Sequence, residues 1–127
     1  MLVLLDSTVL IDHLRGRPAV ARIASLLAAG DTIATSALNV EEIIRGTRPT
    51  ETTIVDSLVD GLVVLPVDEA VARQSGRWRA ELASRGITVH QADCVIAATA
   101  AVHGARLCTG NPKDFPMIEV EHWPVGR

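Results

Sequence analysis

The chain has 127 residues, of which 48% are hydrophobic and 21% are charged, as expected for one globular domain spanning residues 1–127. Its formal net charge of −3 excludes a simple basic nucleic-acid binder, and one Phe, two Trp and no Tyr leave no evident platform for stacking bases. No apolar run reaches the roughly 18 residues of a membrane-spanning helix, and the core must be built from Val, Leu, Ile and Ala.

The N-terminal run Met1–Leu5 has no basic residue before its apolar part, and Asp6 follows it directly. This pattern is unlike a signal peptide, so we expect a cytoplasmic protein. Cys94 and Cys108 lie in apolar segments and are expected to be buried and unpaired. The histidines are too scattered for a zinc site. Eleven of the 12 basic residues are Arg, which suits phosphate contacts but is equally explained as a compositional bias.

Strand and helix patterns alternate along the chain, and a glycine follows each predicted helix. In chain order we predict a buried strand Leu2–Leu5, a helix to about Leu14 capped by Ser7 or Thr8, a helix Ala19–Ala29, a strand Thr32–Ser36, a helix Ala37–Arg45, a helix Thr50–Asp60, a strand Leu62–Leu65, a helix Glu69–Arg85 capped by Asp68, a helix Gln91–His103, a strand Arg106–Thr109 and a short strand Ile118–Glu121. This alternation predicts an α/β fold with a central parallel sheet of four to five strands between helices.

Four acids follow the predicted strands or begin the neighbouring helices. Asp6 comes directly after the first strand, and Asp114 follows the fourth strand in a Gly-Asn-Pro turn. Glu42 or its neighbour Glu41 lies on the helix after the second strand. Asp93 starts a helix so apolar that it must be buried on most sides. An open α/β sheet binds ligands beyond the carboxyl ends of its strands, so we expect these acids to converge.

Each acid also has an ordinary structural explanation. Asp6 and Asp93 suit helix N-caps, Glu42 suits a solvated helix face, and Asp114 suits a simple turn. Ser7 and Thr8 can cap the first helix, however, so Asp6 is not needed there. Four converging carboxylates would repel one another, and Mg²⁺ or Mn²⁺ would relieve that repulsion. Such a site can activate water for attack on a phosphodiester.

Four segments together resemble the PIN-domain family, and specifically its VapC-like toxin type. Each motif is loose alone, but all four occur in order and cover essentially the whole chain. They are Asp6-Ser7-Thr8-Val9-Leu10-Ile11, Glu42-Ile43-Ile44-Arg45-Gly46, Asp93-Cys94-Val95-Ile96-Ala97-Ala98-Thr99-Ala100 and Thr109-Gly110-Asn111-Pro112-Lys113-Asp114-Phe115.

The resemblance implies a three-layer α/β/α sandwich and a Mg²⁺-dependent endoribonuclease activity. Mn²⁺ can replace Mg²⁺ in this activity. It implies that Asp6 and Asp93 are the main metal ligands, and that Glu42 and Asp114 complete the catalytic ring of acids directly or through water. Glu42 is preferred over Glu41 because only Glu42 has a glycine four residues on.

Three further residues match supporting positions of the family. Thr109 and Asn111 correspond to residues that hydrogen-bond the site, and Ser7 stands where the family often has Thr. Proteins of this type are usually homodimers, held inactive by a cognate antitoxin that blocks the acidic pocket. They are the toxins of type II toxin–antitoxin pairs, and they arrest translation by cutting RNA such as tRNA or rRNA. The scarcity of aromatics here departs from the family, so base stacking should contribute little to substrate choice.

Two other functions stay open on the sequence alone. In the first, Asp6 accepts a phosphoryl group in a phosphatase-like or receiver-like α/β protein. Thr8 stands where a haloacid-dehalogenase-type phosphatase has its second Asp, however, and the paired acids of a receiver are missing. In the second, the acids are only helix caps in a non-catalytic interaction module, which would show no dependence on metal.

Overall fold

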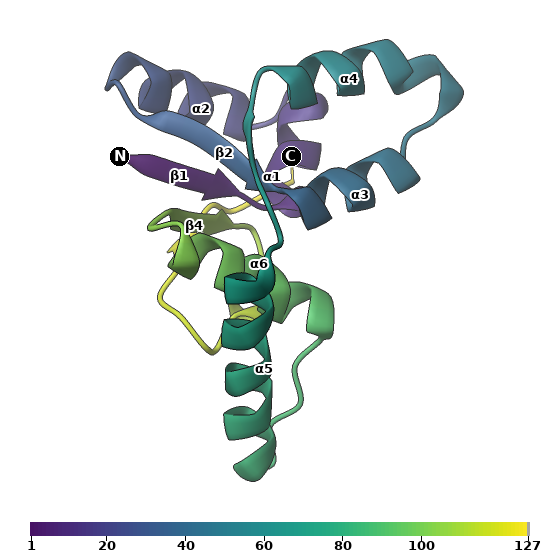
Figure 1. Cartoon of the computed structure of the whole chain (residues 1–127). Helices are drawn as coiled ribbons and strands as arrows, with labels where there is room; N and C mark the ends of the chain where they lie inside the picture. Colours follow the sequence, from purple (N-terminus) through teal and green to yellow (C-terminus); the bar gives the residue numbers. More distant parts are fainter. Residues whose placement is uncertain (127) are drawn as a thin grey trace.

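A computed structural model of the chain describes residues 1–126, and Figure 1 shows the path of the chain. Strands and helices alternate as the sequence predicts. In chain order the elements are β1 (Leu2–Leu5), α1 (Ser7–Leu14), α2 (Ala19–Ala28), β2 (Thr32–Ser36), α3 (Ala37–Arg45), the 3₁₀ turn η1 (Pro49–Glu51), α4 (Thr52–Asp60), β3 (Val63–Leu65), α5 (Glu69–Ser84), α6 (Gln91–Val102), β4 (Arg106–Thr109), the 3₁₀ turn η2 (Pro112–Asp114) and β5 (Glu121–His122).

The five strands form one sheet in the order β3-β2-β1-β4-β5, and every neighbouring pair is parallel. The prediction of a parallel sheet is therefore confirmed. β1 is the central strand, and its Val3, Leu4 and Leu5 are fully buried. Val3 and Leu5 pack into one apolar cluster and Leu4 into another, because successive side chains of a strand point to opposite faces.

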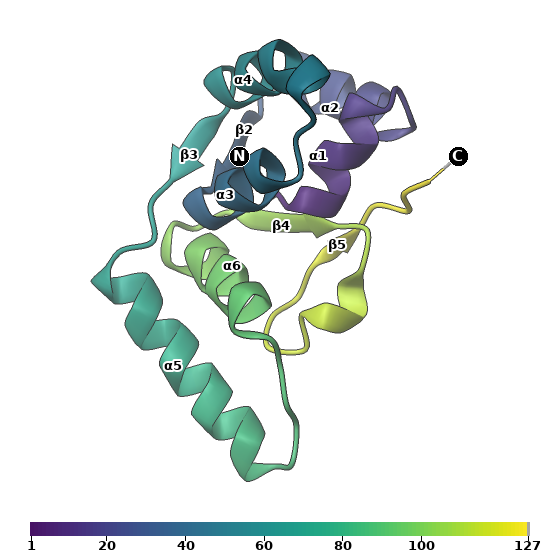
Figure 2. The same ribbon diagram turned by 90° about the vertical axis from the view of Figure 1, so that its right-hand side faces the viewer.

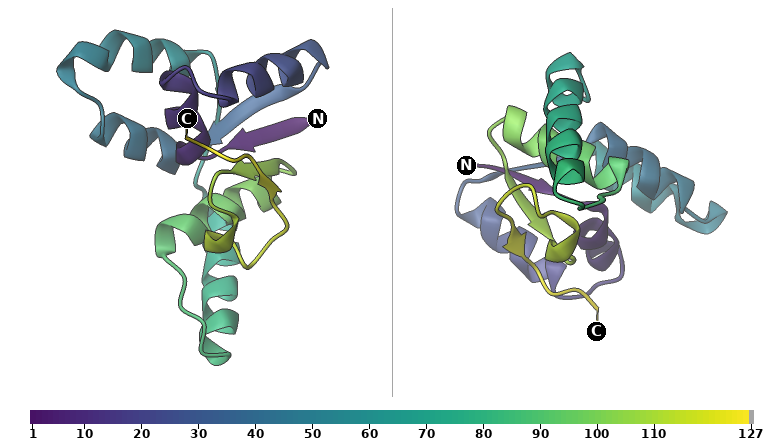
Figure 3. Two further views of the ribbon diagram at one scale, coloured as in Figure 1. Left: turned by 180° about the vertical axis from the view of Figure 1, so that it is seen from behind. Right: turned by 90° about the horizontal axis from the view of Figure 1, so that it is seen from below.

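Helices cover both faces of the sheet, so the molecule has three layers (Figure 2). α1, α2 and α4 cover one face through an apolar cluster that includes Val9, Ile23 and Val55. The alanine-rich α6 lies on the other face through Ile96 and Ala100, and the long α5 packs against α6. The predicted three-layer α/β/α sandwich is confirmed. α3 and α4 project together beyond the sheet (Figure 3).

Cys94 and Cys108 are buried and unpaired, as predicted. No helix among residues 1–126 has the length and apolar character needed to cross a bilayer.

Two elements differ from the sequence predictions by more than one residue, whereas α2, β3, α5 and α6 are each one residue shorter than predicted. The helix expected from Thr50 begins as the 3₁₀ turn η1 at Pro49, and α4 proper starts at Thr52. The fifth strand was expected at Ile118–Glu121, but only Glu121 and His122 pair with β4. Ile118 and Val120 pack instead against the apolar cluster on the α6 side, so their hydrophobic pattern reflects burial of an irregular segment.

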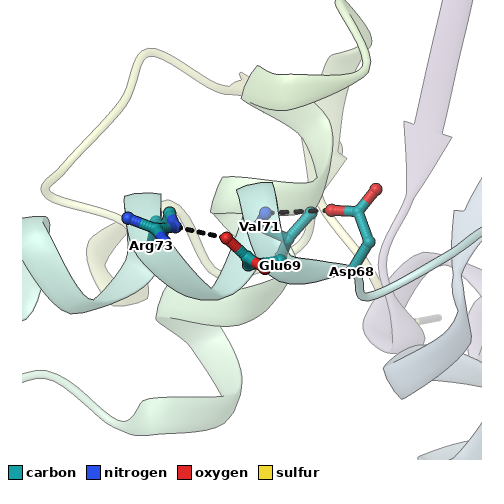
Figure 4. A network of polar contacts seen from close by, with 4 residues as sticks. All are labelled: Asp68, Glu69, Val71 and Arg73. Atoms are coloured by element: carbon teal, nitrogen blue, oxygen red, sulfur yellow. Dashed lines mark hydrogen bonds and ion pairs between the residues drawn. The ribbon is translucent and has the colours of Figure 1, made fainter.

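The start of α5 follows the predicted capping (Figure 4). Asp68 has extended backbone angles, and its Oδ1 accepts a hydrogen bond from the Val71 N–H (3.0 Å). One turn further, Arg73 Nε donates to Glu69 Oε2 (2.7 Å) on the exposed face. The cap satisfies an amide that has no partner within the helix.

Replacing Asp68 with Ala should lower the free energy of unfolding by about 1 kcal/mol, because the Val71 amide loses its partner. Urea denaturation followed by circular dichroism measures this loss. The matched control is Glu81→Ala, which removes the exposed ion pair with Arg85 (3.1 Å). That pair should contribute about 0.5 kcal/mol or less. Equal losses in the two variants would contradict the capping role of Asp68.

Candidate active site

Asp6 lies at the carboxyl end of the central strand β1 and is only 4% exposed. Its Oδ1 accepts hydrogen bonds from the Thr8 hydroxyl (2.5 Å) and the Val9 N–H (3.2 Å). Its Oδ2 accepts one from the Thr109 hydroxyl (2.5 Å), which comes from the end of β4. Both carboxylate oxygens are therefore held in place, one by the start of α1 and one by the neighbouring strand.

The bond from Val9 makes Asp6 the N-cap of α1. The expectation that Ser7 or Thr8 caps this helix is wrong, because the Ser7 hydroxyl donates to Glu42 and the Thr8 hydroxyl donates to Asp6. Asp6 thus both caps the helix and belongs to the acidic site. Burial raises the pKa of Asp6 above its ordinary value, although the hydrogen bonds from Thr109, Thr8 and Val9 act in the opposite direction.

Glu42 reaches the same region from α3 through a chain of polar side chains. The Ser7 hydroxyl donates to Glu42 Oε1 (2.8 Å), and Asn39 Nδ2 donates to Ser7 Oγ (3.0 Å) and to Glu42 Oε1 (3.5 Å). Asn39 is fully buried, and the Ser36 hydroxyl fixes it by donating to Asn39 Oδ1 (2.7 Å). Glu41 is exposed and lines an open groove with Leu38 and Val95. The structure thus places Glu42, and not Glu41, beside Ser7.

Asp93 is the third residue of α6 and half-buried. Its interpretation as an N-cap is wrong, because His90 occupies that position. Burial raises the pKa of Asp93 to about 6, together with repulsion from Asp114 and, to a smaller extent, from Glu42 and Asp6. His90 acts in the opposite direction. This repulsion is consistent with four acids that lie toward the same edge of the sheet.

Asp114 lies in the turn η2 and is held by a neighbour in the same turn. Asn111 Nδ2 donates to Asp114 Oδ2 (2.6 Å), and the Asn111 N–H donates to Thr109 Oγ1 (3.0 Å). Because the Thr109 hydroxyl in turn donates to Asp6, one hydrogen-bonded chain connects the two acids. Thr109, Asn111 and Ser7 therefore all contact an acid of the proposed ring.

The donor set suits a hard divalent cation, because all four side chains offer carboxylate oxygens. Within residues 1–126, however, no three Asp, Glu, His or Cys side chains lie close enough to hold a metal ion as they stand. A shared ion would require some of the acids to move inward. Glu42, Asp93 and Asp114 are partly exposed, whereas Asp6 is buried and both of its oxygens accept hydrogen bonds.

The sequence reasoning missed two polar residues of the site. Thr8 was considered as a helix cap and as the position of a phosphatase's second Asp, yet its hydroxyl donates to Asp6. Asn39 was not singled out, although it orders both Ser7 and Glu42. Its signal was present in the Ser36-Ala37-Leu38-Asn39 spacing, because a serine followed three residues later by a polar side chain is the pattern of a capping box.

Known proteins resemble this chain in sequence and in fold. The family model of the PIN domain matches residues 3–119. The chain is 38% identical over 116 residues to Ribonuclease VapC19 of Mycobacterium tuberculosis, covering 91% of this chain and 93% of that protein. It is 28% identical over 128 residues to the tRNA(fMet)-specific endonuclease VapC of Shigella flexneri, covering 94% and 96%. The DNA-bound VapBC structure from Salmonella typhimurium is similar with a TM-score of 0.83 and 29% identity, covering 97% and 99%.

The raised pKa of Asp93 predicts how stability changes with pH in the absence of metal. Between the ordinary value of 3.8 and about 6, the folded protein holds a proton that the unfolded chain has released. The free energy of unfolding contributed by Asp93 should therefore fall as pH rises through this range. The Asp93→Asn variant lacks this loss, so it should gain stability relative to the wild type between pH 4 and pH 7.

Urea denaturation in EDTA at a series of pH values measures the difference between the two proteins. Comparing them at each pH cancels the titration of groups that are unaffected by the substitution. A constant difference across the range would contradict the repulsion within the acidic site.

Proposed function

This chain belongs to the PIN domain family and, within it, to the VapC-type ribonuclease toxins of toxin–antitoxin systems. On this basis we propose that it is a Mg²⁺-dependent endoribonuclease. We propose that it is the toxin of a type II pair, cuts tRNA or rRNA and inhibits translation until a cognate antitoxin silences it. One observation carries the proposal: hydrogen bonds through Thr109 and Asn111 connect Asp6 at the end of β1 to Asp114 in the turn after β4.

The catalytic residues in this proposal are Asp6, Glu42, Asp93 and Asp114. Asp6 and Asp93 would hold the metal directly, and Glu42 and Asp114 would complete the ring directly or through water. A bound Mg²⁺, or Mn²⁺ in its place, supplies the charge that activates water and neutralises a phosphodiester under attack. The chain itself keeps the Asp6 carboxylate oriented through Thr8 and Thr109, and keeps Glu42 turned toward the site through Ser7.

The proposed substrate is a structured RNA. The Shigella relative is named as a tRNA(fMet)-specific endonuclease, which supports tRNA as the substrate class. A net charge of −3 means that the attraction to RNA must come from bound cations and local arginines. We place this activity in the cytoplasm, where such RNA is found.

The proposed protein partners are an antitoxin and a second copy of the chain. A groove lined by Ile11, Leu14, Ile43 and Val55 also includes Glu42, so a partner segment lying there would contact the acidic site. This supports inhibition by direct blocking. The exposed Val63, Val64 and Val67, at and after the edge strand β3, offer apolar surface for a homodimer.

Replacing Glu42 with Gln should lower the rate of RNA cleavage by about 10- to 100-fold, because even residues that only orient metal ligands have effects of that size. Asp6→Asn and Asp93→Asn should abolish cleavage. The rate is measured on purified tRNA with Mg²⁺, and sequencing of the new RNA ends identifies the bond that is cut.

The matched control is Glu41→Gln, an exposed acid one residue away on the same helix. This variant should cleave at the wild-type rate. The proposal would be refuted by undiminished cleavage in excess EDTA, or by equal losses in Glu41→Gln and Glu42→Gln.

Mg²⁺ should raise the melting temperature of the wild type in a concentration-dependent way, because an ion that binds only the folded protein stabilises it. Asp6→Asn should lose most of this rise. Differential scanning calorimetry measures both, with NaCl at matched ionic strength to separate binding from screening. If neither Mg²⁺ nor Mn²⁺ raises the melting temperature of the wild type, the carboxylates do not form a cation site.

A further inference from the structure

A second buried carboxylate, Asp12, lies outside the acidic site and takes no part in the proposed chemistry. It belongs to α1 and is 2% exposed. Its Oδ2 accepts a hydrogen bond from the Ala19 N–H at the start of α2 (3.0 Å). Its Oδ1 accepts one from the Gly126 N–H (2.9 Å), so Asp12 anchors the segment that follows β5.

Residues 123–126, which we term the C-terminal strap, are held at further points. The Trp123 N–H donates to the Thr109 carbonyl oxygen (2.8 Å), and the Trp123 side chain is 5% exposed. The Arg22 guanidinium lies over the Trp123 ring, with 5.7 Å between Cζ and the ring centroid. Arg22 Nη1 also donates to the Pro124 carbonyl oxygen (3.5 Å).

The strap lies directly on the turn that follows β4. A Cβ atom placed on Gly110 would lie 2.6 Å and 2.8 Å from the two Cγ atoms of Val125, so the Val125 side chain fills the space over this glycine. The Gly110 N–H donates to Thr8 Oγ1 (2.8 Å), and the Thr8 hydroxyl donates to Asp6. Direct contacts therefore connect the C-terminal strap to Gly110, Gly110 to Thr8, and Thr8 to the Asp6 carboxylate.

We propose that Asp12 is a positioning residue for the acidic site: by anchoring the C-terminal strap it presses Val125 onto Gly110, and this fixes the turn that orients Thr8 and Asp6. The inference rests on the proposed function, since it assumes that the acids bind a divalent cation. It adds residues to that function that lie beyond the ring of acids and touch neither cation nor RNA.

The electrostatics of Asp12 agree with a permanent anchor. Burial acts to raise the pKa of this carboxyl, but hydrogen bonds from the Gly126 and Ala19 amides and the charges of Arg17 and Arg22 outweigh burial. The pKa of Asp12 is therefore lowered, and Asp12 is ionised at neutral pH. A carboxylate can accept both backbone bonds at once, whereas an Asn side chain offers only one acceptor oxygen.

The first test measures Mn²⁺ binding by isothermal titration calorimetry on the full chain. Asp12→Asn should weaken Mn²⁺ binding roughly tenfold, the lower end of the range for residues that support metal ligands. Circular dichroism and thermal melting establish that the variant is folded. The matched control is Asp60→Asn, an exposed acid at the end of α4, which should bind Mn²⁺ like the wild type.

The second test does not depend on how Asp12→Asn folds. Gly110→Ala should weaken Mn²⁺ binding, because the new Cβ collides with both Cγ atoms of Val125 and also lies 3.1 Å from Thr8 Oγ1. The double variant Gly110→Ala/Val125→Ala should recover a large part of the loss, because both colliding Cγ atoms are gone. Val102→Ala is the control for losing two methyl groups from a valine of the same 39% exposure.

The outcomes separate the two proposals. If the wild type binds Mn²⁺ and the Asp12 and Gly110 variants bind it equally well, only the positioning role is overturned. A double variant no better than Gly110→Ala would also overturn it, because the contact with Val125 would then not be the cause. A wild type that neither binds Mn²⁺ nor cleaves RNA would refute the proposed function, and the positioning role with it.

Discussion

A carboxylate buried at the end of the central strand is the constraint on which the rest of the site depends. Removing an ionised carboxylate from water without partners costs several kcal/mol, by order of magnitude. Asp6 tolerates burial because three donors reach it, two from the start of α1 and one, Thr109, from the adjacent strand β4. Since β1 and β4 are parallel neighbours, their carboxyl ends meet at one edge. The fold therefore fixes Asp6 and connects it, through Thr109 and Asn111, to Asp114.

The remaining acids differ in how far their charge is compensated. Glu42 accepts hydrogen bonds from Ser7 and Asn39, and Asp114 accepts one from Asn111. Among residues 1–126, no comparable hydrogen bond offsets the burial of Asp93 or the repulsion that it feels, and its pKa rises to about 6. The electrostatic cost of the acidic site therefore falls mainly on the half-buried carboxyl group of Asp93. Under the proposed function, a bound cation would relieve this repulsion at Asp93, and some of the acids would have to move to share it.

Much of the architecture was predictable from local pattern. The bounds of β2, α3 and β4 match the predictions, because apolar runs, a serine cap and a terminal glycine define them within a few neighbouring residues. The rule that parallel strand ends share one edge predicts that the four acids converge, and the hydrogen-bonded link between Asp6 and Asp114 agrees with it. The roles of Thr8, Asn39 and Asp12 did not follow, because they depend on contacts between distant segments. The bond between Asp12 and Gly126, for example, joins residues 114 positions apart.

The same contacts decide between the functions that the sequence left open. A haloacid-dehalogenase-type phosphatase needs a second Asp two residues after the first, but that position is Thr8, whose hydroxyl donates to Asp6. In a module whose acids only cap helices, Asp93 would be expected at the cap position. It lies three residues beyond the His90 cap, and repulsion from Asp114, Glu42 and Asp6 adds to burial in raising its pKa. Its ionised form is therefore costly in the free protein, even though an acid in the first turn of α6 interacts favourably with the helix dipole. Such a cost is typical of groups retained for binding or catalysis, and it agrees with the ribonuclease relatives of this chain.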